Sequence, residues 1–367
     1  MKSNGLIAVG VRLIVSSAGV KLLSRSIALA LTAAIALTAA PAAADPIEDF
    51  YKGKTLTIVS SGGVGGPIDL ACRTLARFLS RHIPGHPSIV VRNMPGGGHV
   101  LMSNYMFTQA PRDGTTIGGV VSSIPTHQVI DGRGVRFDAR QFNWLGSTGY
   151  ANLMTFAWHT SGFKTITDVF ERELVTGVTG VGSGTFVYTN AMNMILGTKF
   201  KMVMGYKDSA AIDLAIERGE VQARGGFTLT GIKQERPQWI GENKIVMLVQ
   251  TGAERERDYP DLPLMHELAR TDEERAILQL ISSPAALGRP FFTPPDVPAD
   301  KVAALRKAFA DTMRDPDYIA EGNRVRLDMN PLSAERVTEL VNLTINASPN
   351  IVARARAALG SDREGDK

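Results

Sequence analysis

The hydrophobic pattern of residues 55–98 predicts a strand, a glycine-rich turn and a helix, then a second strand and a second glycine-rich turn. Apolar β-branched residues run to Val59, as in a buried strand. From Asp69 the apolar positions recur on one helical face until Pro84, a residue that ends helices. A second apolar run at 89–91 leads into the second turn. Two strand ends therefore carry glycine-rich loops.

The glycine turns favour an anion. The first turn holds four glycines within five positions, Gly62, Gly63, Gly65 and Gly66. Glycine lets backbone N–H groups turn toward a ligand with no Cβ in the way, and the following helix N-terminus adds about half a positive charge. In open α/β sheets, ligands bind where such strand ends meet. We therefore expect an anion-binding site at these loops.

The chain repeats this pattern in its second half. A strand at 174–179 precedes a glycine-rich stretch at 180–185, which opens a helix. A strand at 201–204 then leads into a helix that Ser209 can cap. A strand, turn and helix unit that occurs twice predicts two α/β lobes.

Two segments predict crossovers between the lobes: the apolar stretch 142–158 and the charged, proline-containing stretch 255–263. The expected fold is α/β, of the two-lobed type with mixed sheets joined by two crossover segments and a ligand cleft between the lobes. We expect the first lobe at 45–149 and 255–367, and the second at 150–254. The last part is expected to be mostly helical, with short strands at 285–287 and 325–327.

Residues 1–44 resemble an export signal. Four basic residues precede an apolar stretch at 27–40, and small residues follow at 42–44. We expect an exported protein that is cleaved after Ala44. A membrane-spanning helix is not expected, because the apolar run is shorter than the roughly 20 residues that span a membrane. The chain has a net charge of +4, and this segment contributes all of it. The mature chain is then neutral, which argues against a nucleic-acid partner.

Signals for a metal, a cofactor or catalysis are missing or broken. Cys72 is the only cysteine, so no internal disulfide or cysteine cluster can form. His82 and His86 have the spacing of a zinc pair, but Pro84 interrupts the helix that would align them. The first glycine turn lacks the third glycine of a dinucleotide fingerprint, and Ser183 does not lie in a G-x-S-x-G sequence. We expect no cofactor and no metal.

Several motifs, in order, carry a family resemblance. They are the glycine turn closed by Asp69, a V-x-N-x-P-G-x-G loop at 91–98, an A-P-x-D-G turn at 110–114, the stretch 180–185 and a Y-K-x-S turn at 206–209. In these motifs the chain resembles the substrate-binding proteins of tripartite tricarboxylate transporters, the TctC-like or Bug proteins. The resemblance implies a periplasmic type II binding-protein fold, a monomer without enzymatic activity, and a small carboxylate ligand passed to membrane transporter subunits.

The glycine turns and the resemblance together indicate the ligand-binding residues. These are Ser61, Gly62, Gly63, Gly65, Gly66, Asp69, Asn93, Gly96, Gly97, Ser122, Ser123, Gly182, Ser183, Gly184, Thr185, Tyr206 and Asp208. Each has a structural alternative: Asp69 could only stabilise its helix N-terminus, Asn93 could be a turn residue, and Ser183 could only cap a helix. Tyr206 would permit an aromatic carboxylate or could belong to the core.

The ligand itself cannot be inferred from the resemblance. Ser60 and Ser61 stand where many relatives have a proline and an aromatic residue, and Asp208 replaces a glycine. These differences fall at the expected pocket wall. The favoured function is a solute-binding protein for a carboxylate, and the alternative is a secreted α/β hydrolase whose catalytic residues are not recognised.

Overall fold

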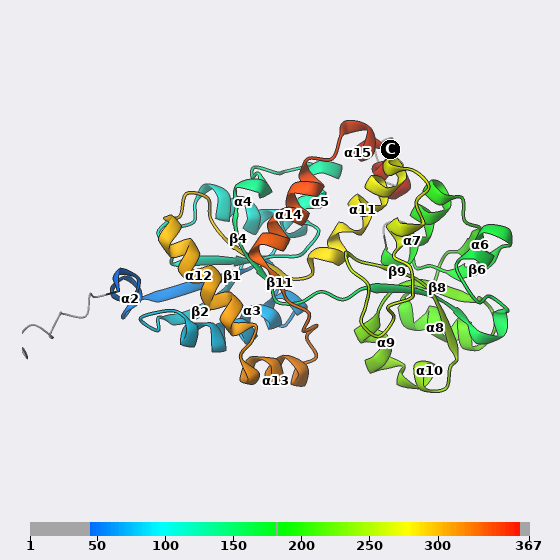
Figure 1. The fold of residues 1–367 in the computed structure, drawn as a ribbon, viewed down its shortest axis with the longest axis horizontal. Helices are drawn as coiled ribbons and strands as arrows, with labels where there is room; N and C mark the ends of the chain where they lie inside the picture. Colours follow the sequence, from blue (N-terminus) through cyan, green and yellow to red (C-terminus); the bar gives the residue numbers. More distant parts are fainter. Residues whose placement is uncertain (1–44, 181–182, 360–367) are drawn as a thin grey trace, which may run out of the picture.

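The structure is a computed structural model that describes residues 45–180 and 183–359, so the predicted signal segment lies outside the described residues. It has two lobes side by side, each built on one mixed β-sheet flanked by helices (Figure 1). The strand orders are β11-β4-β10-β3-β1-β2 in the first sheet and β7-β6-β8-β5-β9 in the second. This confirms the predicted α/β fold with two lobes.

The first sheet consists of β1 (Thr55–Ser60), β2 (Ser88–Asn93), β3 (Thr116–Gly119), β4 (Asn143–Ser147), β10 (Pro290–Thr293) and β11 (Leu332–Ser333). The second consists of β5 (Leu153–Trp158), β6 (Leu174–Gly177), β7 (Phe200–Val203), β8 (Ala223–Thr228) and β9 (Ile245–Thr251). The predicted strands at 285–287 and 325–327 are wrong. The first of these segments ends a helix, and the second contains no strand.

The helices of the first lobe are α2 (Pro46–Tyr51), α3 (Pro67–Leu79), α4 (Val100–Thr108), α12 (Ala299–Thr312), α13 (Pro316–Arg324) and α14 (Ala334–Ile345). The second lobe has α6 (Thr167–Glu171), α7 (Gly184–Ala191), α8 (Ser209–Glu217), α9 (Leu229–Glu235) and α10 (Pro237–Gly241). Between the lobes lie α5 (Ile124–Ile130), α11 (Asp272–Leu287) and α15 (Pro349–Leu359) (Figure 1). Among the described residues, no helix is both long and apolar enough to span a bilayer.

The carboxyl ends of the first sheet's parallel strands face the second lobe. Strands β1, β2 and β3 are parallel, and β4 runs the same way because β10 is antiparallel to both β3 and β4. Strand β4 ends at Ser147, where the chain leaves for β5 in the second sheet. The carboxyl ends of β1, β2 and β3 therefore lie at the edge from which the chain crosses over.

The second sheet also has strands whose carboxyl ends face the other lobe. Strand β5 enters from the first lobe and is antiparallel to β8 and β9, and β6 is parallel to β7 and β8. Leu153, the first residue of β5, pairs with Thr228, the last residue of β8. The carboxyl ends of β6, β7 and β8 therefore point toward the first lobe. The glycine-rich loops of both lobes extend from these facing edges.

The chain crosses between the sheets at places that the sequence predicts only in part. The predicted crossover 142–158 is confirmed, since it contains β4 and β5. The segment 255–263 instead stays on the second lobe, where the Gln250 amide donates to the Pro263 carbonyl at 3.0 Å. The chain returns through α11, and it crosses a third time between α14 and α15. The residue bounds of the lobes stay a prediction.

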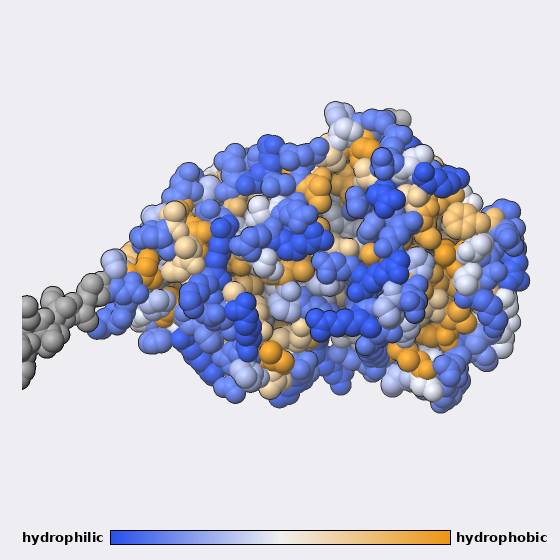
Figure 2. All heavy atoms as spheres, viewed as in Figure 1, coloured by the Kyte–Doolittle hydropathy of each residue, from blue (hydrophilic) through white to orange (hydrophobic). Residues whose placement is uncertain are grey.

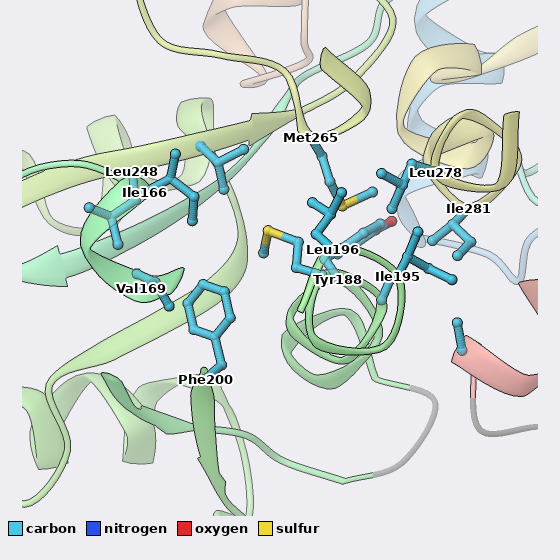
Figure 3. Close-up of a cluster of buried hydrophobic side chains, with 14 of the residues drawn as sticks. Ile166, Val169, Tyr188, Ile195, Leu196, Phe200, Leu248, Met265, Leu278 and Ile281 are labelled. Carbon is cyan, nitrogen blue, oxygen red and sulfur yellow. The ribbon is translucent and has the colours of Figure 1, made fainter. Parts of the chain in front are cut away.

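Helix α11 is part of the second lobe's core before it reaches the first sheet. Its Leu278 and Ile281 point toward Ile195 and Leu196 at the end of the α7 segment (Figure 3). Ala355 and Ala358 of α15 belong to the same cluster of buried side chains. These helices therefore join the core of the second lobe to the first lobe.

Candidate ligand-binding loops

The loop after β1 uses three of its amides internally. The Gly62 N–H donates to Ser60 Oγ at 3.2 Å, Gly66 N–H donates to the Gly63 carbonyl at 3.1 Å, and Gly65 N–H donates to Asp69 Oδ2 at 2.8 Å. Within residues 45–180 and 183–359, no group accepts from the N–H of Gly63 or Val64. These two amides are the loop's available donors.

Asp69 is a buried carboxylate that ties the first loop to the second. Besides the Gly65 amide, it accepts from Arg73 Nε at 2.9 Å and from Asn93 Nδ2 at 2.8 Å. Burial alone would raise the pKa of Asp69, but the hydrogen bonds from Arg73, Gly65 and Asn93 outweigh it and lower that pKa below its ordinary value. Asp69 is thus a carboxylate whose hydrogen bonds hold the loop in place.

Asn93 connects the end of β2 to both sides of this network. Its amide also donates to the Gly62 carbonyl at 2.9 Å, and its Oδ1 accepts from Arg73 Nη2 at 3.0 Å. All three polar functions of this side chain are therefore used inside the protein. This geometry explains why a polar residue is required at this turn. Contact between Asn93 and a ligand stays a prediction.

The second glycine loop needs glycine for its backbone path. Gly96, Gly97 and Gly98 have φ angles of 143°, 55° and 60°, which side chains rarely adopt. His99 follows with φ 76°, and its Nδ1 lies 3.0 Å from both the carbonyl oxygen and Oγ of Ser61. The Gly96 N–H donates to none of the described groups. This loop therefore adds a free amide, and His99 fixes it against the first loop.

Ser122 and Ser123 lie at the carboxyl end of β3, at the same edge as the two glycine loops. Both residues are half-buried. Ser123 precedes α5 but makes no capping hydrogen bond through its side chain. The Ser123 hydroxyl therefore does not cap that helix. This placement keeps both residues among the candidates.

In the second lobe, the candidate hydroxyl groups are engaged with their own loop. Ser183 Oγ donates to the Gly180 carbonyl at 2.7 Å and accepts from the Phe186 N–H, so it caps α7. Thr185 Oγ1 lies 2.8 Å from that hydroxyl and accepts from the Thr179 N–H. Gly184 lies beside Gly226, close to the end of β8. Gly182 is a candidate outside the described residues.

The turn after β7 differs in detail from the prediction. The residue that caps α8 is Asp208, which accepts from the Ala211 N–H at 2.8 Å, and not Ser209. Tyr206 is partly buried against the apolar cluster that contains Met154. Burial, together with the charge of Glu220, raises the pKa of Tyr206. Asp208 has a structural role, and its contact with a ligand stays a prediction.

The described part of the chain offers no clustered metal ligands. No group of three or more His, Cys, Asp or Glu side chains that could hold a metal ion occurs there. The two histidines with zinc-like spacing have separate partners: His82 Nε2 lies 3.0 Å from Asp315 Oδ2, and His86 Nδ1 lies 3.2 Å from the Ser80 carbonyl oxygen. Their spacing therefore does not bring them to one site.

Sequence reasoning missed three contributors to the loops. Arg73 of α3 is partly exposed and bridges Asp69 and Asn93. Its i, i+4 spacing from Asp69 is a signal that could have found it. His99 and the amide of Val64 carry no such local signal, because their roles depend on how the loops fold.

These features define a class: a two-lobed α/β protein of the binding-protein type, with loops at the facing edges of its two sheets. A family model described as the tripartite tricarboxylate transporter family receptor matches residues 72–356. The chain belongs to this family and is a solute-binding receptor, as the sequence motifs indicate. No curated protein sequence gives a significant match to it.

Solved structures of similar fold agree with this assignment. A TctC solute-binding protein from Polaromonas superposes with a TM-score of 0.66 at 14% identity, over 85% of this chain and 99% of that one. The periplasmic binding protein BugD gives 0.51 at 18% identity, over 84% and 98%. An R. palustris protein solved with adipate gives 0.51 at 20% identity, over 82% and 97%. At these low sequence identities, the structural similarity shows that the chain shares the fold of these proteins.

Proposed function

We propose that this receptor captures a carboxylate in the periplasm and delivers it to the membrane subunits of a tripartite tricarboxylate transporter. The observation that carries the proposal is the placement of the glycine loops of both sheets at facing edges. Adipate, the ligand in the R. palustris structure of the same fold, is a carboxylate. Delivery to a transporter is supported by the family of the chain.

The first lobe supplies the donors for the carboxylate. The amides of Gly63, Val64 and Gly96 have no acceptor among the described groups, and the N-terminus of α3 adds its dipole. Hydrogen bonds to a charged acceptor contribute about 1.5–3 kcal/mol each, net of the lost bonds to water, so three of them together favour a bound carboxylate. The engaged residues, Asp69 above all, hold these amides in place before the ligand arrives.

The second lobe completes the site when the lobes close. The loop at 183–185 and the turn at 206–208 extend from the edge that faces the first lobe. Closure of two lobes around a ligand is a common binding motion, and the closed form would be what the transporter recognises. The proposed receptor is a monomer without catalytic activity, exported and cleaved after Ala44.

Thermal unfolding of residues 45–367 tests the proposal. A panel of aliphatic and aromatic carboxylates should contain members that raise the melting temperature, since saturation at 100 times Kd adds about 2.7 kcal/mol of stability. The matched primary amides should have no effect. Mass spectrometry of the recovered ligand distinguishes the alternative, because a receptor returns it unchanged and a hydrolase does not. A panel in which no carboxylate stabilises the protein would contradict the proposal.

A further inference from the structure

Arg73 is paired with a carboxylate that lies inside the proposed binding loop. Hydrophilic residues dominate the face of the molecule shown in Figure 2, so an exposed arginine is by itself ordinary. Arg73 differs in its partner, because its own side chain is 46% exposed whereas that of Asp69 is 2% exposed. Water and salt screen exposed charges strongly and buried charges much less. The charge of Asp69 therefore acts on the loop around it, and Arg73 is the cation that balances this charge.

The buried charge lies next to the amides assigned to the carboxylate. Arg73 Nε and the Gly65 N–H both donate to the same oxygen, Asp69 Oδ2, at 2.9 and 2.8 Å. Val64, whose amide is one of the free donors, precedes Gly65 in the chain, and consecutive Cα atoms are about 3.8 Å apart. A carboxylate bound to the Val64 amide therefore lies within about 10 Å of Asp69. This separation is close to the Debye length of about 8 Å at physiological salt.

The sign of the charge at this loop depends on Arg73. The N-terminus of α3 contributes about half a positive charge, and Asp69 lies in the first turn of that helix. Burial would raise the pKa of Asp69, but hydrogen bonds, above all the one from Arg73, lower it, so the group is ionised at neutral pH. With Arg73 present, the three charges leave the loop positive by about half a charge. Without Arg73, the loop would be negative by about the same amount.

We propose that Arg73 determines the charge specificity of the site: by balancing Asp69, it lets a loop that contains a buried carboxylate accept an anion. Arg73 acts through Asp69, because its Nε bonds to that carboxylate and its Nη2 to Asn93 Oδ1 at 3.0 Å. Without this cation, the same amides would belong to a negative loop, which disfavours a carboxylate and favours an ammonium group. The inference rests on the proposed function, since it concerns the donors of that same site.

Hydrogen exchange of the free amides, followed by NMR on residues 45–367, tests the proposal without a bound ligand. Near neutral pH the exchange of an exposed amide is catalysed by hydroxide, which is itself an anion, so the exchange rate reports the local charge. Arg73→Met should slow exchange at Gly63 and Val64 about two- to tenfold, as expected for removal of a unit charge at this distance. Arg73→Gln, which removes the charge but can still donate to Asp69, should slow it similarly. Arg73→Lys keeps the charge and should stay within about twofold of the parent.

The matched control is Arg77→Met. Arg77 lies one helical turn further along α3 and pairs with Glu321, away from the loop. This variant removes the same charge at a longer, more screened distance, and exchange at Gly63 and Val64 should not change. Melting temperatures confirm that each variant is folded. A purely structural role for Arg73 would loosen the loop and speed exchange, which is the opposite sign. Faster or unchanged exchange in Arg73→Met and Arg73→Gln would therefore overturn the proposal.

Isothermal titration with adipate separates this proposal from the proposed function. The Kd for adipate should be at least about threefold weaker for Arg73→Met than for Arg73→Lys, and high salt should reduce this difference. Arg77→Met should bind adipate like the parent. Equal adipate affinities for the Met and Lys variants at position 73 would overturn the proposal and leave the proposed function intact. If neither adipate nor the rest of the carboxylate panel binds, the proposed function fails, while the exchange rates still decide the role of Arg73.

Discussion

Asn93 Nδ2 donates to Asp69 Oδ1 at 2.8 Å, and this bond joins the end of β2 to the first turn of α3. The same carboxyl group accepts from the Gly65 amide through Oδ2. One buried side chain therefore fixes both glycine loops, the one after β1 and the one after β2. The position of the free amides depends on a residue whose own bonds are satisfied within the protein.

Replacing this carboxylate should lower stability. Asp69→Ala removes the acceptor for Gly65, Arg73 and Asn93, and we expect a loss of about 1–3 kcal/mol of unfolding free energy. Urea unfolding at pH 7 measures it. The control is Asp317→Ala, which removes an exposed partner of Arg81 and should cost less than about 0.5 kcal/mol. Equal urea midpoints for the parent and Asp69→Ala would show that this hydrogen-bond network does not stabilise the fold.

The contribution of Asp69 to the unfolding free energy should fall as the pH falls. Its hydrogen bonds lower the pKa of Asp69 in the folded state below the ordinary value. As the pH falls, Asp69 therefore binds a proton in the unfolded state before it does so in the folded state. The stabilisation is complete above the unfolded pKa and is lost as the pH falls through the folded one. The difference in unfolding free energy between the parent and Asp69→Ala should therefore shrink from pH 7 to pH 2.5. A constant difference would contradict the assigned hydrogen bonds.

A buried ion pair in the second lobe gives a further prediction. Arg224 of β8 pairs with Asp213 of α8, and both side chains are nearly inaccessible. Burial raises the pKa of Asp213 and lowers that of Arg224. Asp213→Ala leaves the guanidinium without its main partner and should cost about 3–5 kcal/mol. The double variant Asp213→Leu, Arg224→Met should be more stable than Asp213→Ala by urea unfolding. The reverse order would show that an unpaired Arg224 guanidinium is not the main cost of Asp213→Ala.

The cap of α8 provides a matched pair of neighbouring variants. Asp208→Ala removes the acceptor for the Ala211 amide and should cost about 0.5–2 kcal/mol. Ser209→Ala, at the residue that the sequence predicts as the cap, should change stability by less than about 0.5 kcal/mol. Thermal unfolding of both variants decides which residue caps the helix. A larger loss in Ser209→Ala would contradict the observed geometry.

The sequence predicts the local units well because their signals are local. β-branched residues, glycines and an apolar helical face lie within a few residues of one another at β1 and α3. In α11 the local signal misleads. Pro284 suggests an end to the helix, but the helix continues to Leu287, which is fully buried. Packing of α11 against both lobes outweighs the lost backbone hydrogen bond.

The sequence predicts which loops form the candidate site, but not which of their backbone amides are free to donate to a ligand. Which amides are free depends on Asp69, Ser60 and the Gly63 carbonyl taking up the others. Those pairings form only when the loops are folded together. The same holds for the third crossover, since nothing near Ser348 signals that α15 packs on the second lobe.

Amide NMR during ligand titration tests the central claim most directly. Residues 45–367, labelled with ¹⁵N, are titrated with the carboxylate that stabilises the protein most and then with its primary amide. The account predicts downfield amide-proton shifts at Gly63, Val64 and Gly96 with the carboxylate and none with the amide. Unchanged resonances at these three positions, while residues elsewhere respond to the bound carboxylate, would contradict it.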